Sequence, residues 1–169
     1  QQGVDRMRQL MEDFLTLDRI GDSRRRLASA PCDLAELLSV FAAETRSADR
    51  HRHAIELLPP EQPLPPVMLD KALVQQIVSN LLSNACKYSP PGRPVTLAWA
   101  RQGEWIDIDV RDHGIGVPPQ DLPRLFGTFM RASNVGDVPG TGLGLAIVRQ
   151  AAESHGGSVG VTSRVGEGT

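Results

Sequence analysis

The chain has 169 residues, enough for one domain with its own core and one further element. Hydrophobic residues make up 40% and charged residues 22%, and the net charge of -2 gives no basic surface for nucleic acid, which we exclude as a partner. No apolar run reaches the roughly 20 residues of a membrane span, and the start lacks the layout of a secretory signal. Together with two cysteines that show neither metal nor disulfide spacing, this favours a soluble, cytoplasmic domain.

Two amphipathic helices are predicted in the first third of the chain. Apolar residues recur every three or four positions in residues 1–20, as in a helix that packs on other helices: Met7, Leu10, Phe14 and Leu17. Gly21 ends this helix. Asp33, followed three residues later by Glu36, forms a capping box for a second helix over residues 33–46.

The middle of the chain predicts extended segments on both sides of a third helix. Residues 51–70 read as two short extended pieces around a proline-rich loop, and Asp70 can cap a helix over 71–88. Two strands follow, over 94–100 and 104–110, where apolar and polar residues alternate. We therefore expect helices and strands in one mixed domain.

The last third combines a loop, a helix and a strand. Residues 125–140 have no clear period and predict a mobile loop. A glycine cluster then opens a helix over 143–155, which Gly156 and Gly157 end, and residues 158–163 predict a final strand.

The glycine cluster GDVPGTGLGLAIVRQ fits neither of two familiar phosphate motifs. No Gly-Lys pair occurs, which excludes a Walker loop, and the spacing of Gly140, Gly142 and Gly144 is not that of a dinucleotide fingerprint. Two interpretations stay open at this point. The helix N-terminus could bind phosphate through its free N–H groups, or the cluster could be only a tight turn.

Two asparagines lie one turn apart at the edge of the apolar face of the predicted helix 71–88. Asn80, Asn84 and Lys87 could address one point. Amide oxygens can help hold Mg2+, an ammonium neutralises phosphate, and the ring of Tyr88 could stack on a base. The alternative is that each amide bonds nearby backbone.

The stretch DHGIG, residues 112–116, follows the second strand. The Asp112 carboxylate can accept a hydrogen bond from an exocyclic amine such as that of adenine, and Gly114 and Gly116 leave room for a flat ring. The alternative is a plain turn.

These motifs, in this order, resemble the ATP-binding catalytic domain of bacterial sensor histidine kinases, within the superfamily that also contains gyrase, a heat-shock chaperone and mismatch-repair ATPases. NLLSNACKYS resembles the asparagine box, DHGIG the DxGxG box, LFGTFMR the phenylalanine box and GTGLGLAIV the second glycine box.

The resemblance implies a role for each matching residue. Asn84 and Asn80 would hold Mg2+ and the phosphates, Lys87, Tyr88 and Arg131 would contact phosphate or base, and Asn84, Lys87 and Arg131 would be catalytic. Asp112 would bind the adenine amine, with Gly114, Ile115 and Gly116 lining its pocket. Phe126 and Phe129 would be packing anchors of the loop. The GEGT stretch would supply one more residue of the site, Thr169. The phosphates would contact the residues of the glycine cluster: Gly140, Gly142, Leu143, Gly144 and Leu145.

The resemblance also implies a fold and partners. The fold would be α+β, a two-layer sandwich of a mixed sheet with helices on one face, over residues 23–169 and lacking its last strand. Residues 1–22 would be a helical stub, the end of a dimerisation hairpin. The cofactors would be ATP and Mg2+. The partners would be the missing hairpin with its phosphoacceptor histidine, a response regulator, and a second copy in the full-length protein, whether or not that protein is anchored in the inner membrane.

Two other functions stay open. An ATP-hydrolysing relative of the gyrase or chaperone type usually has an acidic base one turn before the key asparagine, where this chain has Asn80. A non-catalytic module with a decayed nucleotide site is the third hypothesis, and the intact motifs argue against it.

Overall fold

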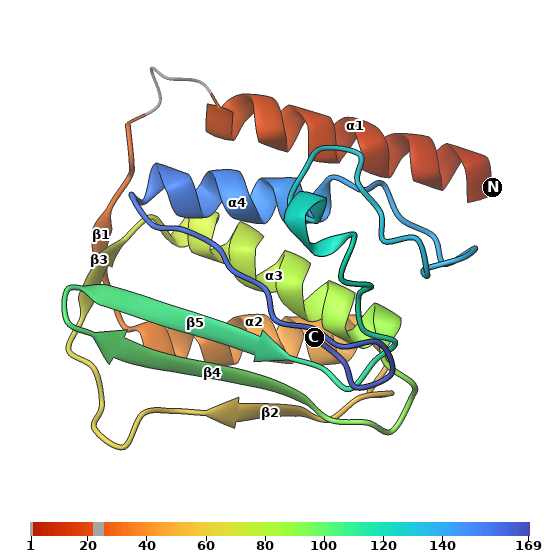
Figure 1. Cartoon of the computed structure of the whole chain (residues 1–169). Coiled ribbons are helices and arrows are strands. Elements are labelled where there is room, and N and C mark those ends of the chain that lie inside the picture. The colour runs from red at the N-terminus through yellow and green to blue at the C-terminus, as the bar shows by residue number, and fades with distance from the viewer. Residues whose placement is uncertain (1, 22–25) are drawn as a thin grey trace.

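A computed structural model describes residues 2–21 and 26–169 (Figure 1). The elements in chain order are α1 (Gln2–Gly21), β1 (Ala30–Cys32), α2 (Leu34–Ala48), β2 (Ile55–Leu58), β3 (Val67–Leu69), α3 (Lys71–Tyr88), β4 (Val95–Gln102), β5 (Trp105–Arg111), the 3-10 turn η1 (Leu122–Arg124) and α4 (Gly144–Ser154). The predicted boundary between residues 22 and 23 lies outside the described residues. Within these ranges no helix is long and apolar enough to cross a membrane.

The main sheet is mixed and has the order β2-β4-β5. β2 runs parallel to β4, and β4 runs antiparallel to β5. α2 and α3 pack on this sheet, α4 packs on α3, and α1 packs on α4 (Figure 1). This arrangement confirms the predicted α+β class.

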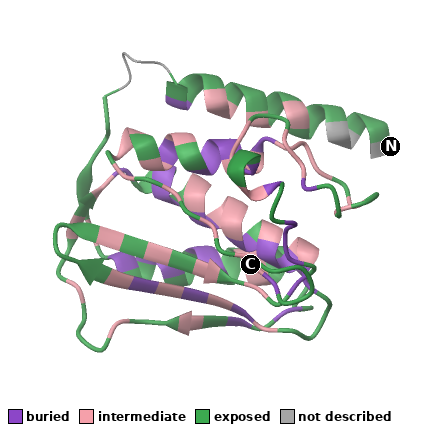
Figure 2. Cartoon of the chain, viewed as in Figure 1, coloured by how far each residue is buried: buried purple, intermediate pink, exposed green. Residues whose placement is uncertain are grey.

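Burial follows the alternation of the strands and the apolar faces of the helices. The buried residues of β4 alternate over its first five positions and are Val95, Leu97 and Trp99, whose side chains meet α2 and α3. Figure 2 shows the buried residues gathered between the sheet and these helices and along α4. The core therefore fixes α3, whose other side faces a cleft.

Two short segments differ from the expectations. The pairing of β1 with β3 was not predicted. β1 is only three residues long and contains Pro31, so the sequence shows no alternating pattern there that would indicate a strand. Residues 158–163 were expected to be a strand, and this prediction is wrong. They alternate between exposed and half-buried, as strand residues do, but form no ladder with any described strand. The periodic pattern sets which side chains face inward, whereas a strand also needs a hydrogen-bonded neighbour.

The apolar stripe of α1 is only partly covered. Ile20 is buried against α3 and α4, and Leu17 is half-buried beside it. Met7 and Phe14 are 66% and 60% exposed. Within the described chain, therefore, the apolar contacts of α1 are concentrated at its C-terminal end.

The N-cap of α2 offers a direct test of the local prediction. The Asp33 carboxylate accepts a hydrogen bond from the Glu36 N–H at 3.0 Å. We expect Asp33→Ala to lower the free energy of unfolding by about 1 kcal/mol, because an orphan N–H of the first turn loses its partner. Urea unfolding measures the loss. Asp33→Ser should retain most of the stability, and equal losses in both variants would contradict the capping role.

Candidate functional site

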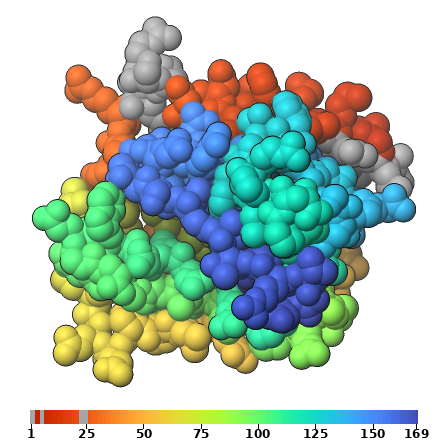
Figure 3. Space-filling view, viewed as in Figure 1, coloured from red at the N-terminus to blue at the C-terminus, as the bar shows by residue number. Residues whose placement is uncertain are grey.

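A large cleft lies between α3, β5, the loop over residues 125–140 and the start of α4. Its volume is about 2680 Å3, well above the roughly 300–1,000 Å3 of small-molecule pockets, so a ligand would fill only part of it. Figure 3 shows the face on which the C-terminal segment crosses between the β4–β5 hairpin and this loop. Most of the predicted site residues line the cleft: Asn80, Asn84, Lys87, Tyr88, Asp112, Ile115, Gly116, Arg131, Gly140, Gly142, Gly144, Leu145 and Thr169.

The asparagines of α3 face the start of α4. The Asn80 amide nitrogen donates to the Gln76 carbonyl at 2.8 Å, so the bond to nearby backbone that the sequence left open is made here. Its oxygen is left to face α4, since a Cβ built on Gly144 would lie 2.7 Å from Asn80 Oδ1. Asn84 is one turn further along α3, half-buried on the cleft wall. α3 therefore presents the Asn80 amide oxygen towards the glycine cluster, with Asn84 one turn further along the same wall.

Lys87 and Tyr88 reach the same glycine cluster from the end of α3. The Lys87 ammonium lies 4.9 Å from the centre of the Tyr88 ring. A Cβ built on Gly140 would lie 2.7 Å from Lys87 Nζ and 3.7 Å from Tyr88 Oη. The absence of a side chain at position 140 is thus what lets a cation sit against the loop backbone.

The Asp112 turn is built from backbone hydrogen bonds. Asp112 Oδ1 accepts from the Gly114 N–H at 2.7 Å, and the Asp112 N–H donates to the Thr169 carbonyl at 2.8 Å. Burial raises the pKa of Asp112 above its ordinary value of 3.8, an effect that the Gly114 hydrogen bond partly offsets. Oδ1 is thus committed to the turn, and the backbone of Thr169 also favours the charged form of the carboxylate.

Gly114 and Gly116 make the turn fit closely against neighbouring backbone. A Cβ on Gly114 would collide with the Tyr88 carbonyl, and one on Gly116 with the Arg164 carbonyl. Between them, Ile115 donates its N–H to the Tyr88 carbonyl at 3.2 Å, and its side chain is 38% exposed. The turn is thereby joined to the end of α3.

The start of α4 lies directly against the loop. Gly142 has φ +73°, and a Cβ there would lie 2.8 Å from the Phe129 carbonyl carbon. The Leu143 N–H donates to Thr141 Oγ at 3.3 Å, while Gly144 and Leu145 belong to the first turn of α4, where N–H groups lack helical partners. Gly142 therefore forms a tight turn, which was one of the two interpretations of the glycine cluster. The N–H groups at the start of α4 are also free of helical partners, as the other interpretation requires.

Arg131 is on the cleft wall but bonds the loop itself. Its guanidinium donates to the carbonyls of Gly136 at 3.2 Å and Val138 at 2.6 Å. Its Nε is buried and without a partner among the described residues, so one donor is left over for a ligand. Phe129, predicted as a packing anchor, is 64% exposed, and this prediction is wrong. The backbone at Phe129 is left-handed, with φ 60°, and the aromatic side chain is exposed to solvent rather than packed in the core.

One contact at the site had no indication in the sequence. Thr141 Oγ donates to Asp13 Oδ2 of α1 at 2.6 Å, which links two residues 128 positions apart. No spacing rule covers so long a separation, so only the fold brings α1 onto the glycine cluster.

Comparisons with known proteins identify the family of the chain. Residues 69–169 match the family model described as histidine kinase-, DNA gyrase B-, and HSP90-like ATPase. The chain is 34% identical over 168 residues to sensor histidine kinase Hik2 of Thermosynechococcus vestitus, covering 95% of this chain and 43% of that protein. It is 30% identical over 174 residues to sensor histidine kinase WalK of Bacillus subtilis, covering 100% of this chain and 28% of that protein.

A solved structure has the same fold over nearly the whole chain. Full-length ShkA in complex with AMPPNP superimposes with a TM-score of 0.85 at 30% identity, covering 99% of this chain and 35% of that one. The present chain thus spans less than half the length of each of these relatives.

Proposed function

Because the chain belongs to the histidine kinase-, DNA gyrase B- and HSP90-like ATPase family, as the ATP-binding catalytic domain of a sensor histidine kinase, we propose that it transfers the γ-phosphoryl group of ATP to a histidine. In the transfer, the bond between the γ-phosphorus and the bridging oxygen of ADP breaks, and a phosphorus–nitrogen bond forms on an imidazole. That imidazole belongs to a dimerisation domain, from which a response regulator would then take the phosphoryl group.

One observation carries the proposal: groups suited to each part of a nucleotide converge on one cleft from separate elements. Asp112 would accept from the adenine amine, with the ring in the space beside Ile115 and Gly116. Lys87 and the open turn of α4, at Gly144 and Leu145, would meet the phosphates. Arg131 Nε, which has no partner among the described residues, is the kind of donor that a phosphate would use, and Gly140 gives Lys87 room beside the loop backbone.

The amide oxygens of Asn84 and Asn80 are the groups that would hold Mg2+, which neutralises phosphate charge when bound. Thr169 would support the site indirectly, because its carbonyl accepts the Asp112 N–H. Lys87 would orient the phosphates by charge. The chain's own residues thus bind and align ATP, and the acceptor nitrogen comes from outside the cleft.

Hydrolysis is disfavoured by the residue one turn before Asn84. A water-activating base must accept a proton, but Asn80 is an amide whose nitrogen is already bonded to the Gln76 carbonyl. The purified chain should therefore bind ATP without appreciable turnover. Sustained phosphate release by the wild-type chain would favour the gyrase-like alternative.

Asn84→Ala tests the metal part of the proposal. We expect it to weaken ATP binding about tenfold or more in the presence of Mg2+, because the substitution removes an amide oxygen. Titration calorimetry with and without Mg2+ measures the change. Gln75→Ala, exposed on the same helix, is the matched control. If Asn84→Ala binds ATP as tightly as this control with Mg2+ present, Asn84 is not a ligand.

Transfer itself is tested by supplying a dimerisation hairpin from a relative, or the longer native chain, with labelled ATP. We expect acid-labile, base-stable phosphate on the hairpin, and none with Asp112→Asn. Tight ATP binding without any transfer to hairpin or longer chain would favour a non-catalytic nucleotide-binding module.

A further inference from the structure

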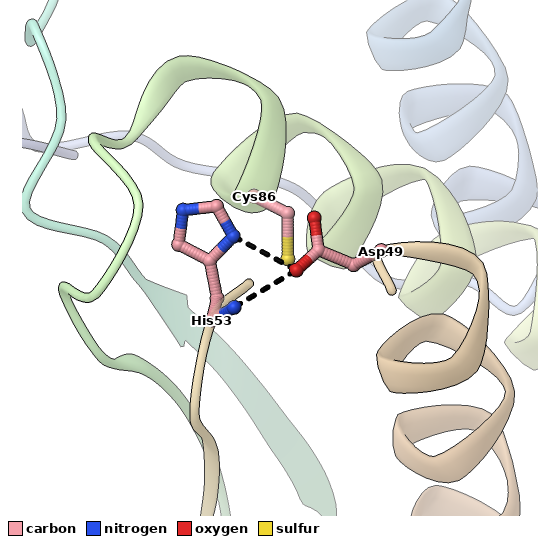
Figure 4. A group of neighbouring side chains, drawn as sticks. All are labelled: Asp49, His53 and Cys86. Carbon is pink, nitrogen blue, oxygen red and sulfur yellow. Dashed lines mark hydrogen bonds and ion pairs between the residues drawn. The ribbon is translucent and has the colours of Figure 1, made fainter. Parts of the chain in front are cut away.

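Three side chains able to bind a metal meet in the core behind the cleft. Asp49 follows α2, His53 lies in the next loop and Cys86 is on α3 (Figure 4). One ligand atom from each lies within 4.8 Å of the others, and all three residues are buried. The side chains of Asp49 and His53 are only 4% and 1% exposed. No assigned role of the nucleotide site uses them.

The two nitrogens of His53 both face acceptors. Nδ1 is 3.0 Å from Asp49 Oδ2, and Nε2 is 3.3 Å from the Ser89 carbonyl oxygen. A neutral imidazole has one N–H, which can satisfy only one of these oxygens. If the proton is on Nε2, the lone pair of His53 Nδ1 faces the Asp49 carboxylate oxygen Oδ2 in the buried core, and the two repel each other. Two arrangements relieve this repulsion. The proton can sit on Nδ1 and be donated to Asp49, or it can stay on Nε2 while a metal ion lies between Nδ1 and the carboxylate.

We propose that Asp49, His53 and Cys86 form a binding site for a divalent transition metal of the zinc type, distinct from the Mg2+ of the nucleotide. Imidazole nitrogen, thiolate sulfur and carboxylate oxygen are the three ligand types of zinc, with bonds of roughly 2.0–2.3 Å. Ligand atoms around such an ion are therefore on the order of 3–4 Å apart, which these side chains reach with small adjustments.

The groups behind the ligands suit this role. Ser89 offers its carbonyl to Nε2, as backbone carbonyls commonly do for a metal-bound histidine, and this leaves Nδ1 for the ion. Arg52 donates to the other Asp49 oxygen at 3.1 Å and so orients the carboxylate. With Cys86 as thiolate, the three ligands and a divalent ion are together neutral, and the Arg52 side chain is 59% exposed to water.

Cys86 connects this site to the cleft. A cysteine binds a metal as its thiolate, so the metal must displace the proton of the Cys86 thiol on binding. A magnesium ion prefers oxygen ligands and would not do so. Cys86 lies between Asn84 and Lys87 in the sequence of α3, so the ion would tie the end of α2 to the part of α3 that faces the nucleotide.

Cobalt provides the test, because a thiolate bound to Co2+ gives a charge-transfer absorption band. We expect the nucleotide-free chain, reduced with a phosphine, to develop this band with one equivalent of Co2+ and to lose it when Zn2+ is added. Excess Mg2+ should leave the band unchanged. Cys86→Ala should abolish it, whereas Cys32→Ser, which removes the less buried cysteine, should keep it.

Zn2+ should also raise the melting temperature of the wild-type chain and of Cys32→Ser, but not that of Cys86→Ala or His53→Gln. If the variants do not fold, the wild-type titration decides. Absence of the band, or a band that persists in Cys86→Ala, would overturn the proposal and leave a proton between His53 and Asp49. Because no nucleotide is present, neither result depends on the proposed kinase function.

Discussion

Asp112→Asn is expected to weaken ATP binding by about 10–100-fold while the domain stays folded. One Asp112 oxygen already accepts the Gly114 N–H, and in the proposed site the other would accept from the adenine amine. Asparagine has a single acceptor, and its NH2 group would face one of the two donors. A lost hydrogen bond to a charged group costs about 1.5–3 kcal/mol, which corresponds to this range of affinity. Titration calorimetry measures it.

Asp18→Asn is the matched control, since it makes the same change on an exposed residue of α1 outside the cleft. The wild-type chain should also lose ATP affinity as the pH falls through the Asp112 pKa, which burial places above 3.8. The carboxylate is the acceptor, so protonation weakens binding, and Asp112→Asn should lack this pH dependence. An unchanged affinity in Asp112→Asn would remove Asp112 from the site.

Gly142→Ala is expected to weaken ATP binding about tenfold. The backbone at this position has φ +73°, which costs a residue with a Cβ about 1–2 kcal/mol. The new methyl group would also press on the backbone of Phe129 and Met130 and shift the loop away from α4. Titration calorimetry gives the affinity, and a retained melting transition shows that the core is intact.

Gly136→Ala separates the two effects. Gly136 lies in the same loop with φ +52°, but a Cβ there would meet nothing within 4 Å. It carries the conformational cost without the collision, so its ATP affinity should stay within about twofold of the wild type. Equal losses in Gly136→Ala and Gly142→Ala would mean that loop strain alone, and not the contact with α4, controls binding.

Much of the fold could be predicted because the decisive features are local. Asp33 and Asp70 cap the helices that follow them, and Gly103 makes the turn between the two strands. The side chains on α3 follow helical spacing, which by itself places Asn80, Asn84 and Lys87 on one side of the helix. The order of the four motifs, rather than any single motif, indicates a nucleotide-binding site.

The rest depends on contacts between distant segments. Asp49 and Cys86 are brought together by the packing of α2 on α3, and cysteine spacing alone gave no metal pattern. Arg131 lines the cleft as expected, and its guanidinium also bonds two carbonyls of its own loop, contacts that spacing does not determine. The strand expected over 158–163 lacks a partner for the same reason, because pairing is a property of two segments.

The missing ladder has a further consequence for β5. Within the described chain β5 pairs only with β4, so its other side presents a row of backbone donors and acceptors. Such a row is a template for an added strand from any chain that fits, including another copy of this one. Asp107 and Asp109 on β5 are both exposed, and their charges oppose the stacking of identical edges. Asp107 and Asp109 therefore protect the chain against pairing of its own β5 edges.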